Sequence, residues 1–259
     1  MSDDKKYLLR TPSFRLDGKV AVVTGSGRGI GKGCAMGLAQ AGAHTVCVSR
    51  TQSDLDETKA EIEELGGSAE TLICDVTSTE QIREKIGGLE RIDVLVNNAG
   101  TNIPQPFLEI PEENVDKVIA VNTKAVFMAA QVVAQKMVDQ GEGGSIINMS
   151  SQMGHVGGPI RTVYCMTKHG VEGLTKAMAC DLADYNIRVN TIAPTFVNTP
   201  MALQFFKNEA FKQSVMDQIL LDRIADIEDI MGACVYLASP ASAMVTGTSL
   251  VVDGGWTAK

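Results

Sequence analysis

The chain has 259 residues, of which 44% are hydrophobic, and its formal net charge is -8. This length and apolar content are enough for one large core, so we expect a single domain. The acidic charge and the lack of a clustered Lys/Arg run argue against nucleic acid and an anionic membrane as partners, because both require a basic surface. A small-molecule substrate is favoured.

The six cysteines are scattered, mostly within apolar segments, and form no C-x-x-C pair or cluster at metal-ligand spacing. We therefore expect reduced core thiols in a cytoplasmic protein, and no metal site. Residues 1–15 mix charges early and lack an apolar stretch long enough for a signal peptide or a membrane span. They predict a surface arm that precedes a domain over residues 16–259.

After this arm, short apolar runs alternate with longer helical segments. The expected strands lie at about 19–24, 44–49, 70–74, 93–97, 145–149, 188–192 and 249–252. The expected helices begin near residues 30, 53, 79, 112, 163 and 227. The strands are almost continuous apolar runs, as strands buried on both faces are. The alternation predicts an α/β Rossmann fold, with a doubly wound parallel seven-stranded sheet and helices on both faces.

Residues 195–222 insert extra helical sequence between the last two expected strands. Ligands of open parallel sheets bind beyond the carboxyl ends of the strands, so an insertion there is placed to form a lid. An ordinary surface helical hairpin is the alternative.

A glycine-rich turn, T-G-S-G-R-G-I-G from Thr24 to Gly31, follows the first apolar run and precedes a helical one. Glycine allows a tight turn and a close approach of pyrophosphate, and the helix N-terminus offers free amide donors and a positive dipole end. This context predicts a dinucleotide site. A glycine turn with a structural role only is the alternative.

Four further segments accompany this turn: C-D-V at 74–76, N-N-A-G at 97–100, Y-x-x-x-K at 164–168 and V-D-G-G at 252–255. Together with the spacing G-x-x-x-G-x-G they resemble the short-chain dehydrogenase/reductase family, from Leu16 to the C-terminus. The stretches V-I-A-V-N-T-K-A-V-F and L-A-D-Y-N-I-R-V-N-T-I-A-P and the ending V-D-G-G-W look like its gluconate 5-dehydrogenase branch, which handles sugar acids and polyols. The resemblance implies hydride transfer between a nicotinamide and a secondary alcohol or ketone.

The cofactor contacts that the resemblance implies come from the glycine turn, the end of the second strand, the C-D-V and N-N-A-G segments, the Y-x-x-x-K pair and the segment after the sixth strand. They are Gly25, Ser26, Arg28, Gly29, Ile30, Gly31, Ser49, Arg50, Asp75, Val76, Asn98, Ala99, Gly100, Tyr164, Lys168, Pro194, Val197 and Thr199. Asp75 would lie by the adenine.

The choice of nicotinamide cofactor depends on the end of the second strand. A carboxylate there would bond the ribose 2′-hydroxyl and repel a 2′-phosphate. This chain has Ser49 and Arg50 at that place, with Arg28 in the glycine turn. A guanidinium matches a phosphate through paired donors. We expect NADP(H), while NAD(H) and a merely solvated Arg50 remain open.

Tyr164 and Lys168 are four residues apart on an expected helix, so their side chains share a face. A tyrosine has a pKa near ~10, and lowering it to about 7 requires roughly 4 kcal/mol. A cation about 4 Å away in a partly shielded site contributes on the order of 4 kcal/mol. We therefore expect Lys168, aided by an oxidised nicotinamide, to lower the pKa of Tyr164.

The resemblance implies four catalytic residues. Tyr164 would exchange a proton with the substrate oxygen, and Lys168 would also hold the nicotinamide ribose. Ser151, chosen over Ser150 for its thirteen-residue distance from Tyr164, would hydrogen-bond the carbonyl or alkoxide. Asn122 would kink a helix and hold a water that relays protons to Lys168. Two departures from the family are Thr195, where glycine commonly follows Pro194, and a short segment at 78–91.

The substrate is less legible than the reaction. Candidate substrate residues lie in the loops after N-N-A-G, between Ser151 and Tyr164, and after the sixth strand: Thr101, Asn102, Ser151, Gln152, His155, Arg161 and Thr195. Either His155 or Arg161 would suit a carboxylate, although a surface or structural place in the loop is the favoured interpretation for each.

Two other functions remain open. A 3-oxoacyl-[acyl-carrier-protein] reductase would share every catalytic motif but would need a basic entrance for its acidic carrier, which the sequence does not clearly offer. A cofactor-sensing or scaffolding protein without catalysis is disfavoured because Asn122, Ser151, Tyr164 and Lys168 are all present.

The resemblance also implies a homotetramer with helix–helix interfaces. Helical segments 112–139 and 163–185 carry wide apolar faces, for which packing within one chain is the alternative. These faces include Val118, Val121, Ala125, Val132, Val171, Leu174, Ala177 and Met178.

Overall fold

The computed structural model describes residues 9–259, and in them the strands form one parallel sheet with the order β3-β2-β1-β4-β5-β6-β7. The strands are β1 (Val20–Thr24), β2 (His44–Ser49), β3 (Ser68–Ile73), β4 (Val94–Asn97), β5 (Gly144–Met149), β6 (Ile187–Pro194) and β7 (Ser249–Val252). All seven expected strands are confirmed, and so is the α/β Rossmann fold class. β6 begins one residue earlier and ends two residues later than expected, at Pro194.

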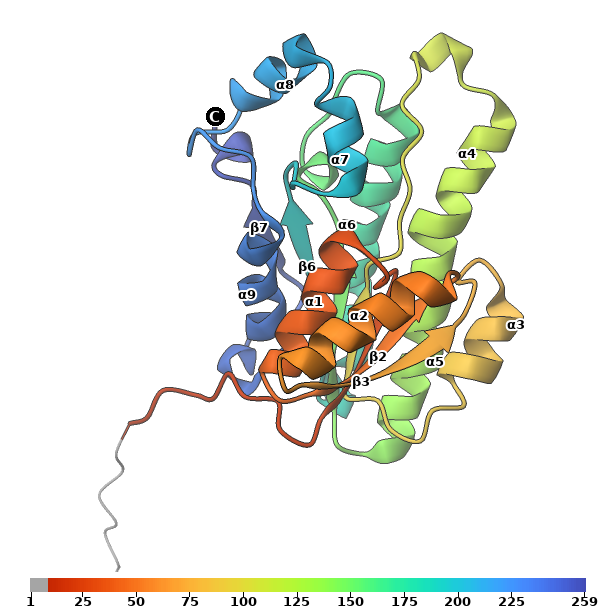
Figure 1. Ribbon diagram of the computed structural model, residues 1–259. Helices are drawn as coiled ribbons and strands as arrows, with labels where there is room; N and C mark the ends of the chain where they lie inside the picture. The colour runs from red at the N-terminus through yellow and green to blue at the C-terminus, as the bar shows by residue number, and fades with distance from the viewer. Residues whose placement is uncertain (1–8) are drawn as a thin grey trace, which may run out of the picture.

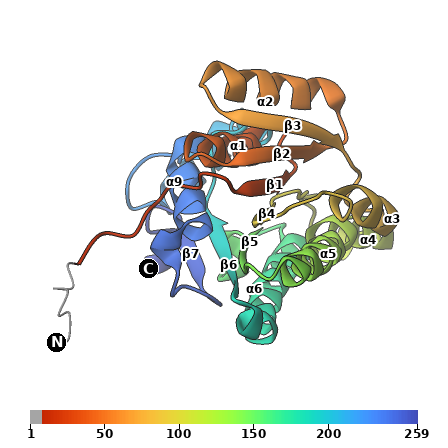
Figure 2. The same ribbon diagram turned by 90° about the horizontal axis from the view of Figure 1, so that it is seen from below.

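Helices cover both faces of this sheet (Figures 1 and 2). They are α1 (Gly29–Gln40), α2 (Gln52–Glu64), α3 (Thr79–Gln81), α4 (Glu112–Ile119), α5 (Ala125–Gln140), α6 (Thr162–Leu182), α7 (Pro200–Phe205), α8 (Glu209–Met216) and α9 (Ile227–Ala238). Figure 2 shows α1, α2 and α9 toward one side of the sheet, and α3, α4, α5 and α6 toward the other. The short segment at 78–91 forms only α3 and one π-helical turn, Ile82–Ile86.

The core consists of two apolar layers, one on each face of the sheet. In β1, Ala21 and Val23 pack into the layer under α1 and α9, whereas Val22 packs into the layer under α5. β4 follows the same two-residue period, with Leu95 on the α5 side. This alternation explains why the strand sequences are continuously apolar: both faces of each strand are buried.

The order of the strands determines where a ligand can bind. The chain runs from β1 outward to β2 and β3 and then returns to place β4 on the other side of β1. At such a switch point the connections leave in opposite directions and open a crevice beyond the carboxyl ends of the strands. The glycine turn follows β1, and N-N-A-G begins at the last residue of β4, so both segments lie at this crevice.

The segment expected to form a lid contains α7 and α8, which lie beyond the carboxyl end of β6 (Figure 1). It has a small apolar cluster of its own, built around Phe206, Val215 and Ile219. Its two ends are tied together, because Asn198 N donates to Ala225 O at 2.8 Å and Ala225 N donates to Phe196 O at 3.3 Å. The segment is therefore a folded flap on a fixed base, and its closure over a ligand stays a prediction.

The expectation for the cysteines needs correction. Cys34, Cys47, Cys74 and Cys234 are buried, but Cys180 is exposed and Cys165 is half-buried. These two lie on the outer side of α6, so not all six thiols belong to the core. Residues 9–15 form the exposed arm as expected, and the arm's remaining part lies outside the described residues.

The apolar faces of the long helices serve the core more than we expected. Val118, Ala125 and Val171 are at most 4% exposed, so packing within the chain accounts for them. The continuous helical segment Glu112–Gln140 is long and apolar enough to cross a membrane by length and composition alone. Its inner face, which includes Val133 and Met137, packs into the core, and this packing explains its apolar character.

Candidate active site

The glycine turn depends on glycine at two positions in particular. Gly25 has φ +67°, and a Cβ there would lie 2.9 Å from Ala99 Cα. A Cβ on Gly31 would lie 2.3 Å from both the Gly25 carbonyl oxygen and Asn98 Nδ2. Larger residues would push the turn away from the N-N-A-G loop. α1 begins at Gly29, so its free amide groups face the crevice.

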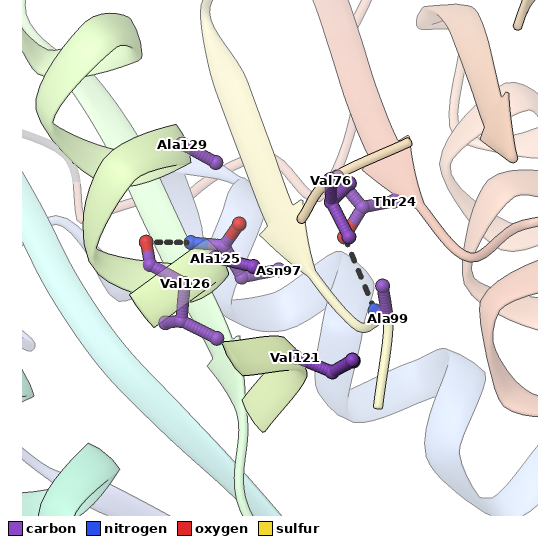
Figure 3. Close-up of a pocket in the computed structure, with 8 residues that line it drawn as sticks. All are labelled: Thr24, Val76, Asn97, Ala99, Val121, Ala125, Val126 and Ala129. Atoms are coloured by element: carbon purple, nitrogen blue, oxygen red, sulfur yellow. Dashed lines mark hydrogen bonds between the residues drawn. The ribbon is translucent and has the colours of Figure 1, made fainter. Parts of the chain in front are cut away.

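Thr24 and Asn98 join the glycine turn to the N-N-A-G loop, and Figure 3 shows the hydrogen bond between Thr24 and Ala99. Thr24 Oγ1 accepts from the backbone amides of Asn98 at 3.0 Å and Ala99 at 3.1 Å. Asn98 Nδ2 donates in return to the carbonyl oxygens of Thr24 at 3.0 Å and Gly25 at 3.1 Å. Sequence reasoning missed Thr24. The only signal was a hydroxyl at the last residue of an otherwise apolar strand.

Beside this junction is a narrow hollow, lined by Val76 and Val121 among others (Figure 3). Asp75, next in the chain to Val76, accepts from the Thr77 amide at 3.0 Å and the Thr77 hydroxyl at 2.8 Å. Burial raises the pKa of Asp75, but these bonds and the charge of Arg50 outweigh it, so the pKa is lowered overall. The carboxylate is therefore ionised at the rim of the hollow.

The other expected cofactor residues differ in exposure. Arg28 and Arg50 are exposed, and within residues 9–259 neither forms an ion pair. Ser26 is fully buried and its hydroxyl donates to Val48 O at 3.4 Å, which places this side chain in the scaffold instead of at a ligand. Sequence reasoning missed Asp54, whose Cβ would lie 2.8 Å from a Cβ on Gly27.

Beyond the carboxyl end of β6, the structure places the remaining expected cofactor residues near the turn. Thr199 caps α7, and a Cβ on Gly29 would lie 3.4 Å from its Cγ2. Thr195, where the family commonly has glycine, has no positive φ, so its backbone does not need glycine's freedom. Pro194 and Val197 are buried at the base of the flap.

Asn122 sits in a π-helical turn, Ala120–Lys124, between α4 and α5, so the expected helix irregularity is confirmed. Its Oδ1 accepts from Thr101 N at 2.8 Å, and its Nδ2 donates to Thr101 O at 2.9 Å and Thr167 Oγ1 at 3.2 Å. The amide group thus fixes the loop after N-N-A-G against α6. Both hydrogens of the Asn122 amide nitrogen are used in this way.

Tyr164 and Lys168 lie one turn apart on α6, as expected. Lys168 is buried, and its Nζ donates to Met149 O at 2.7 Å while lying 5.6 Å from the centre of the Tyr164 ring. Burial lowers the pKa of Lys168 to about 8, and the charge of Glu172 opposes this shift in part. Lys168 is therefore a cation that gives up its proton near neutral pH.

The expected lowering of the Tyr164 pKa by Lys168 is wrong for the protein's own side chains. Burial raises the pKa of the Tyr164 phenol, and a hydrogen bond with Ser151 and the charge of Arg161 oppose this only in part. The reason is geometric, because the Lys168 ammonium is bonded to Met149 O and faces the ring. In the protein alone, Tyr164 is a proton donor.

Ser151 is 5% exposed and follows β5. Its hydroxyl donates to Gln152 Oε1 at 2.7 Å and accepts from Met153 N at 3.1 Å. Gln152, expected as a substrate residue, instead orients Ser151. Ser150 donates its backbone amide to Ile192 O at 2.8 Å, as a backbone-bonding neighbour should, but its hydroxyl has no partner in the described chain.

The structure separates the two residues that suited a carboxylate. His155 Nε2 lies 2.9 Å from Ser249 Oγ and 3.4 Å from Glu172 Oε1, so it belongs to a polar cluster between α6 and β7. These bonds favour the structural role for His155, and a contact of its ring with substrate stays a prediction. Arg161 is 8% exposed and precedes α6, near Tyr164.

Comparison with known proteins agrees with this site. A family model described as Enoyl-(Acyl carrier protein) reductase matches residues 25–257. The chain belongs to the short-chain dehydrogenase/reductase family. It is therefore an NAD(P)-dependent oxidoreductase.

Its relatives differ in substrate. L-xylulose reductase of Bos taurus is 40% identical over 245 residues, covering 95% of this chain and 99% of that protein. A 3-oxoacyl-[acyl-carrier-protein] reductase FabG of Thermotoga maritima is 39% identical over 246 residues, covering 93% and 99%. A gluconate 5-dehydrogenase from Burkholderia cenocepacia J2315, solved with NADP and tartrate, has a TM-score of 0.91 at 35% identity, covering 96% of this chain and 99% of that one. Overall similarity therefore does not choose the substrate.

Proposed function

We propose that this enzyme interconverts a secondary alcohol and a ketone on a sugar acid or polyol, with NADP(H) as the preferred cofactor. The observation that carries this proposal is the convergence of Ser151, Tyr164 and Lys168 beside the glycine turn, at the carboxyl edge of the sheet. A purely cofactor-sensing protein would have no use for a buried lysine and an oriented serine next to a tyrosine.

The described residues fit a nicotinamide dinucleotide. The close contact between Gly31 and Gly25 leaves the amides of the α1 N-terminus bare for pyrophosphate. Val76, which is next in the chain to Asp75, and Val121 line the surface that would face the adenine. When bound, the nicotinamide supplies or accepts the hydride.

The protein's own groups handle the proton. In ketone reduction, the Tyr164 hydroxyl donates to the substrate oxygen, and its raised pKa keeps that proton in place at neutral pH. Ser151 would donate a second hydrogen bond to the same oxygen once its single hydroxyl hydrogen turns from Gln152 Oε1 to the substrate. Lys168 places its positive charge over the face of the Tyr164 ring. Because the Asn122 amide is fully used, a relay water would bind a backbone carbonyl freed by the π-helical turn.

The preference for NADP(H) rests on two exposed guanidiniums. Arg50 follows β2 and Arg28 lies in the glycine turn, where a 2′-phosphate would lie, while Asp54 approaches the turn from α2 and the Asp75 carboxylate senses the charge of Arg50. The paired donors of the two guanidiniums favour a phosphate over a bare hydroxyl, and the two carboxylates oppose this preference. Asp54 makes this preference weaker than two arginines alone would.

We also propose a cytoplasmic homotetramer. A groove of about 360 Å³ runs between α5 and α6 and is lined by Phe127, Met178 and Tyr185 among others. The Phe127 and Tyr185 side chains are 45% and 51% exposed. A second copy would cover these aromatic rings, and sedimentation velocity would give the mass of the assembly.

The test of the proposed reaction is turnover of the purified enzyme with NADP⁺ and with NAD⁺, against D-gluconate, D-sorbitol and xylitol, followed at 340 nm. Reduction of acetoacetyl-carrier protein by NADPH is the competing assay. Turnover of the sugar substrates supports the proposal. Faster turnover of the carrier-bound substrate would replace it with the fatty-acid reductase, and binding of NADPH without any turnover would indicate a sensor.

A further inference from the structure

Arg161 is a buried cation without a counter-ion among the described side chains. Its residue is only 8% exposed. The ion pairs and side-chain hydrogen bonds of the described residues do not include its guanidinium. Buried charges in proteins are ordinarily paired, so this one requires an explanation.

The surroundings of Arg161 strengthen its interaction with any anion that it binds. Its guanidinium carbon lies 5.8 Å from the centre of the Phe196 ring and 5.3 Å from that of Phe205. Aromatic faces attract the cation without neutralising it, and they exclude water. Phe205 belongs to α7 of the flap, so the flap itself walls the cation.

Arg161 is also close to the reacting groups. It precedes Tyr164 by three residues, and its charge opposes in part the rise that burial causes in the pKa of the Tyr164 phenol. Burial lowers the pKa of Arg161 itself, as expected for a charge that has given up water without gaining a partner. A substrate whose oxygen meets Tyr164 would therefore have its other end within reach of the guanidinium.

The backbone before Arg161 is held in an unusual conformation. Ile160 has φ +53°, a left-handed value that a β-branched residue rarely adopts. Its carbonyl accepts from Gln105 N at 3.1 Å, which fixes the loop in this shape. Backbone strain of this kind clusters at ligand sites, and here it lies directly before the buried Arg161.

Two unpaired oxygens add to the same pattern. Thr195 Oγ1, next in the chain to Phe196, is buried and has no hydrogen-bond partner in the described part of the chain. The same holds for Asn102 Oδ1, in the loop after N-N-A-G. Both residues were expected to face substrate. A polyhydroxylated ligand would supply the missing donors.

We propose that Arg161 binds the carboxylate of the substrate and thereby makes the enzyme select hydroxy acids over neutral polyols. The inference rests on the proposed function and narrows its substrate class. A guanidinium presents two parallel donors that match a carboxylate. A neutral polyol leaves the buried cation without a partner, and a site of this kind rejects such an analogue strongly.

The chain provides its own reporter for this interaction. Trp256 is the single tryptophan, and its ring centre lies 5.8 Å from that of Phe196, which in turn packs against Arg161. Its fluorescence can be followed while the NADP⁺-loaded full chain is titrated with matched pairs. D-gluconate and D-sorbitol, D-xylonate and xylitol, and L-threonate and L-threitol each differ only by the carboxylate.

The variants are Arg161→Met, which keeps the apolar stem, and Arg161→Lys, which keeps the charge but loses the paired donors. We expect the wild type to bind at least one acid far more tightly than its polyol. In Arg161→Met the Kd for that acid should rise about 100-fold, and in Arg161→Lys about tenfold. Arg83→Met, which removes an exposed arginine on the π-helical turn at 82–86, is the matched control and should leave this Kd unchanged.

The outcomes separate the inference from the reaction itself. A wild type that binds acid and polyol equally, or an Arg161→Met variant that keeps full affinity for the acid, overturns the role of Arg161 even if sugar turnover is observed. The folded wild type could instead bind the acid through Arg161 but turn over none of the pairs. That outcome would support the role of Arg161 and contradict the proposed reaction. Thermal melting of each variant checks that it is folded, and Arg161→Lys serves if Arg161→Met is not.

Discussion

The two halves of the active site are completed to different degrees. In the cofactor half, the side chains of Thr24 and Asn98 each form hydrogen bonds to backbone groups of the other segment. These bonds fix the glycine turn in the protein alone. In the substrate half, Arg161 has no anion, and Thr195 Oγ1 and Asn102 Oδ1 have no hydrogen-bond partner among the described residues. The polar groups of the first half are paired within the protein, whereas several in the second half have no partner among the described residues.

This difference indicates which half of the site determines substrate specificity. A buried polar group without a partner costs about 1–3 kcal/mol, which the fold tolerates only when something is gained. A cofactor common to many relatives can bind to a site whose polar groups are already paired within the protein. A particular substrate is selected by groups that only its own polar atoms satisfy.

The largest effect should follow from Tyr164→Phe, which removes the proton donor and leaves the cofactor half intact. General acid catalysis contributes about 10²–10⁴-fold, so we expect kcat to fall by roughly 10³-fold. NADPH affinity, measured by fluorescence titration, should change little. Tyr236→Phe, which removes a hydroxyl from a half-buried ring on α9 that packs on Phe14, is the control. Full turnover in folded Tyr164→Phe would mean that another group moves the proton.

Breaking the finished half should cost stability. Thr24→Val keeps the shape of the side chain but leaves the amides of Asn98 and Ala99 without their acceptor. We expect the free energy of unfolding, measured in urea, to fall by about 2 kcal/mol. Thr24→Ser retains the hydroxyl and should lose much less. If the two variants are equally stable, the junction is not held by this oxygen.

A smaller effect is expected at the exposed edge of the cofactor half. Arg50→Ala should lower the ratio of kcat/KM for NADPH over NADH by about tenfold, since an exposed charge pair is partly screened by solvent. Asp54→Asn should move the ratio in the opposite direction, because it removes a nearby carboxylate. A ratio that neither change alters would place the 2′-phosphate elsewhere.

The two halves also differ in how far the sequence predicts them. The glycine turn, N-N-A-G and the apolar strands are local patterns, and their positions in the fold follow from the order of the strands. The direction of His155 and the burial of Arg161 depend on contacts with β7 and the flap, which are distant in the chain. Local pattern therefore gave both loop residues equal standing, and only tertiary packing separated them.

The prediction for Lys168 had the same limit. Its four-residue spacing from Tyr164 does not predict that Met149 O accepts a hydrogen bond from the ammonium. Spacing along a helix predicts that two side chains share a face. It does not predict which atom of the second side chain the first one meets, or how far burial shifts the pKa of either.

The smallest predicted effect concerns the link between Lys168 and the cluster of Glu172, His155 and Ser249. The charge of Glu172 raises the pKa of Lys168, which burial has lowered to about 8. Glu172→Gln keeps an acceptor for Thr191, whose hydroxyl lies 3.0 Å from both carboxylate oxygens, but removes the charge. The pKa of Lys168 should therefore fall further, and the cation should be lost at a lower pH.

Ketone reduction makes this shift measurable. The pKa of Tyr164 is raised, so Tyr164 keeps its proton, and Lys168 is the first of the two to titrate as pH rises. The wild-type profile of kcat/KM should decline through about pH 8, and in Glu172→Gln the decline should begin at lower pH, by a fraction of a unit. Glu64→Gln, at an exposed position on α2, should leave the profile in place. A decline that stays at the wild-type pH would show that Glu172 does not hold the proton on Lys168, and that the cluster between α6 and β7 is electrostatically separate from the catalytic residues.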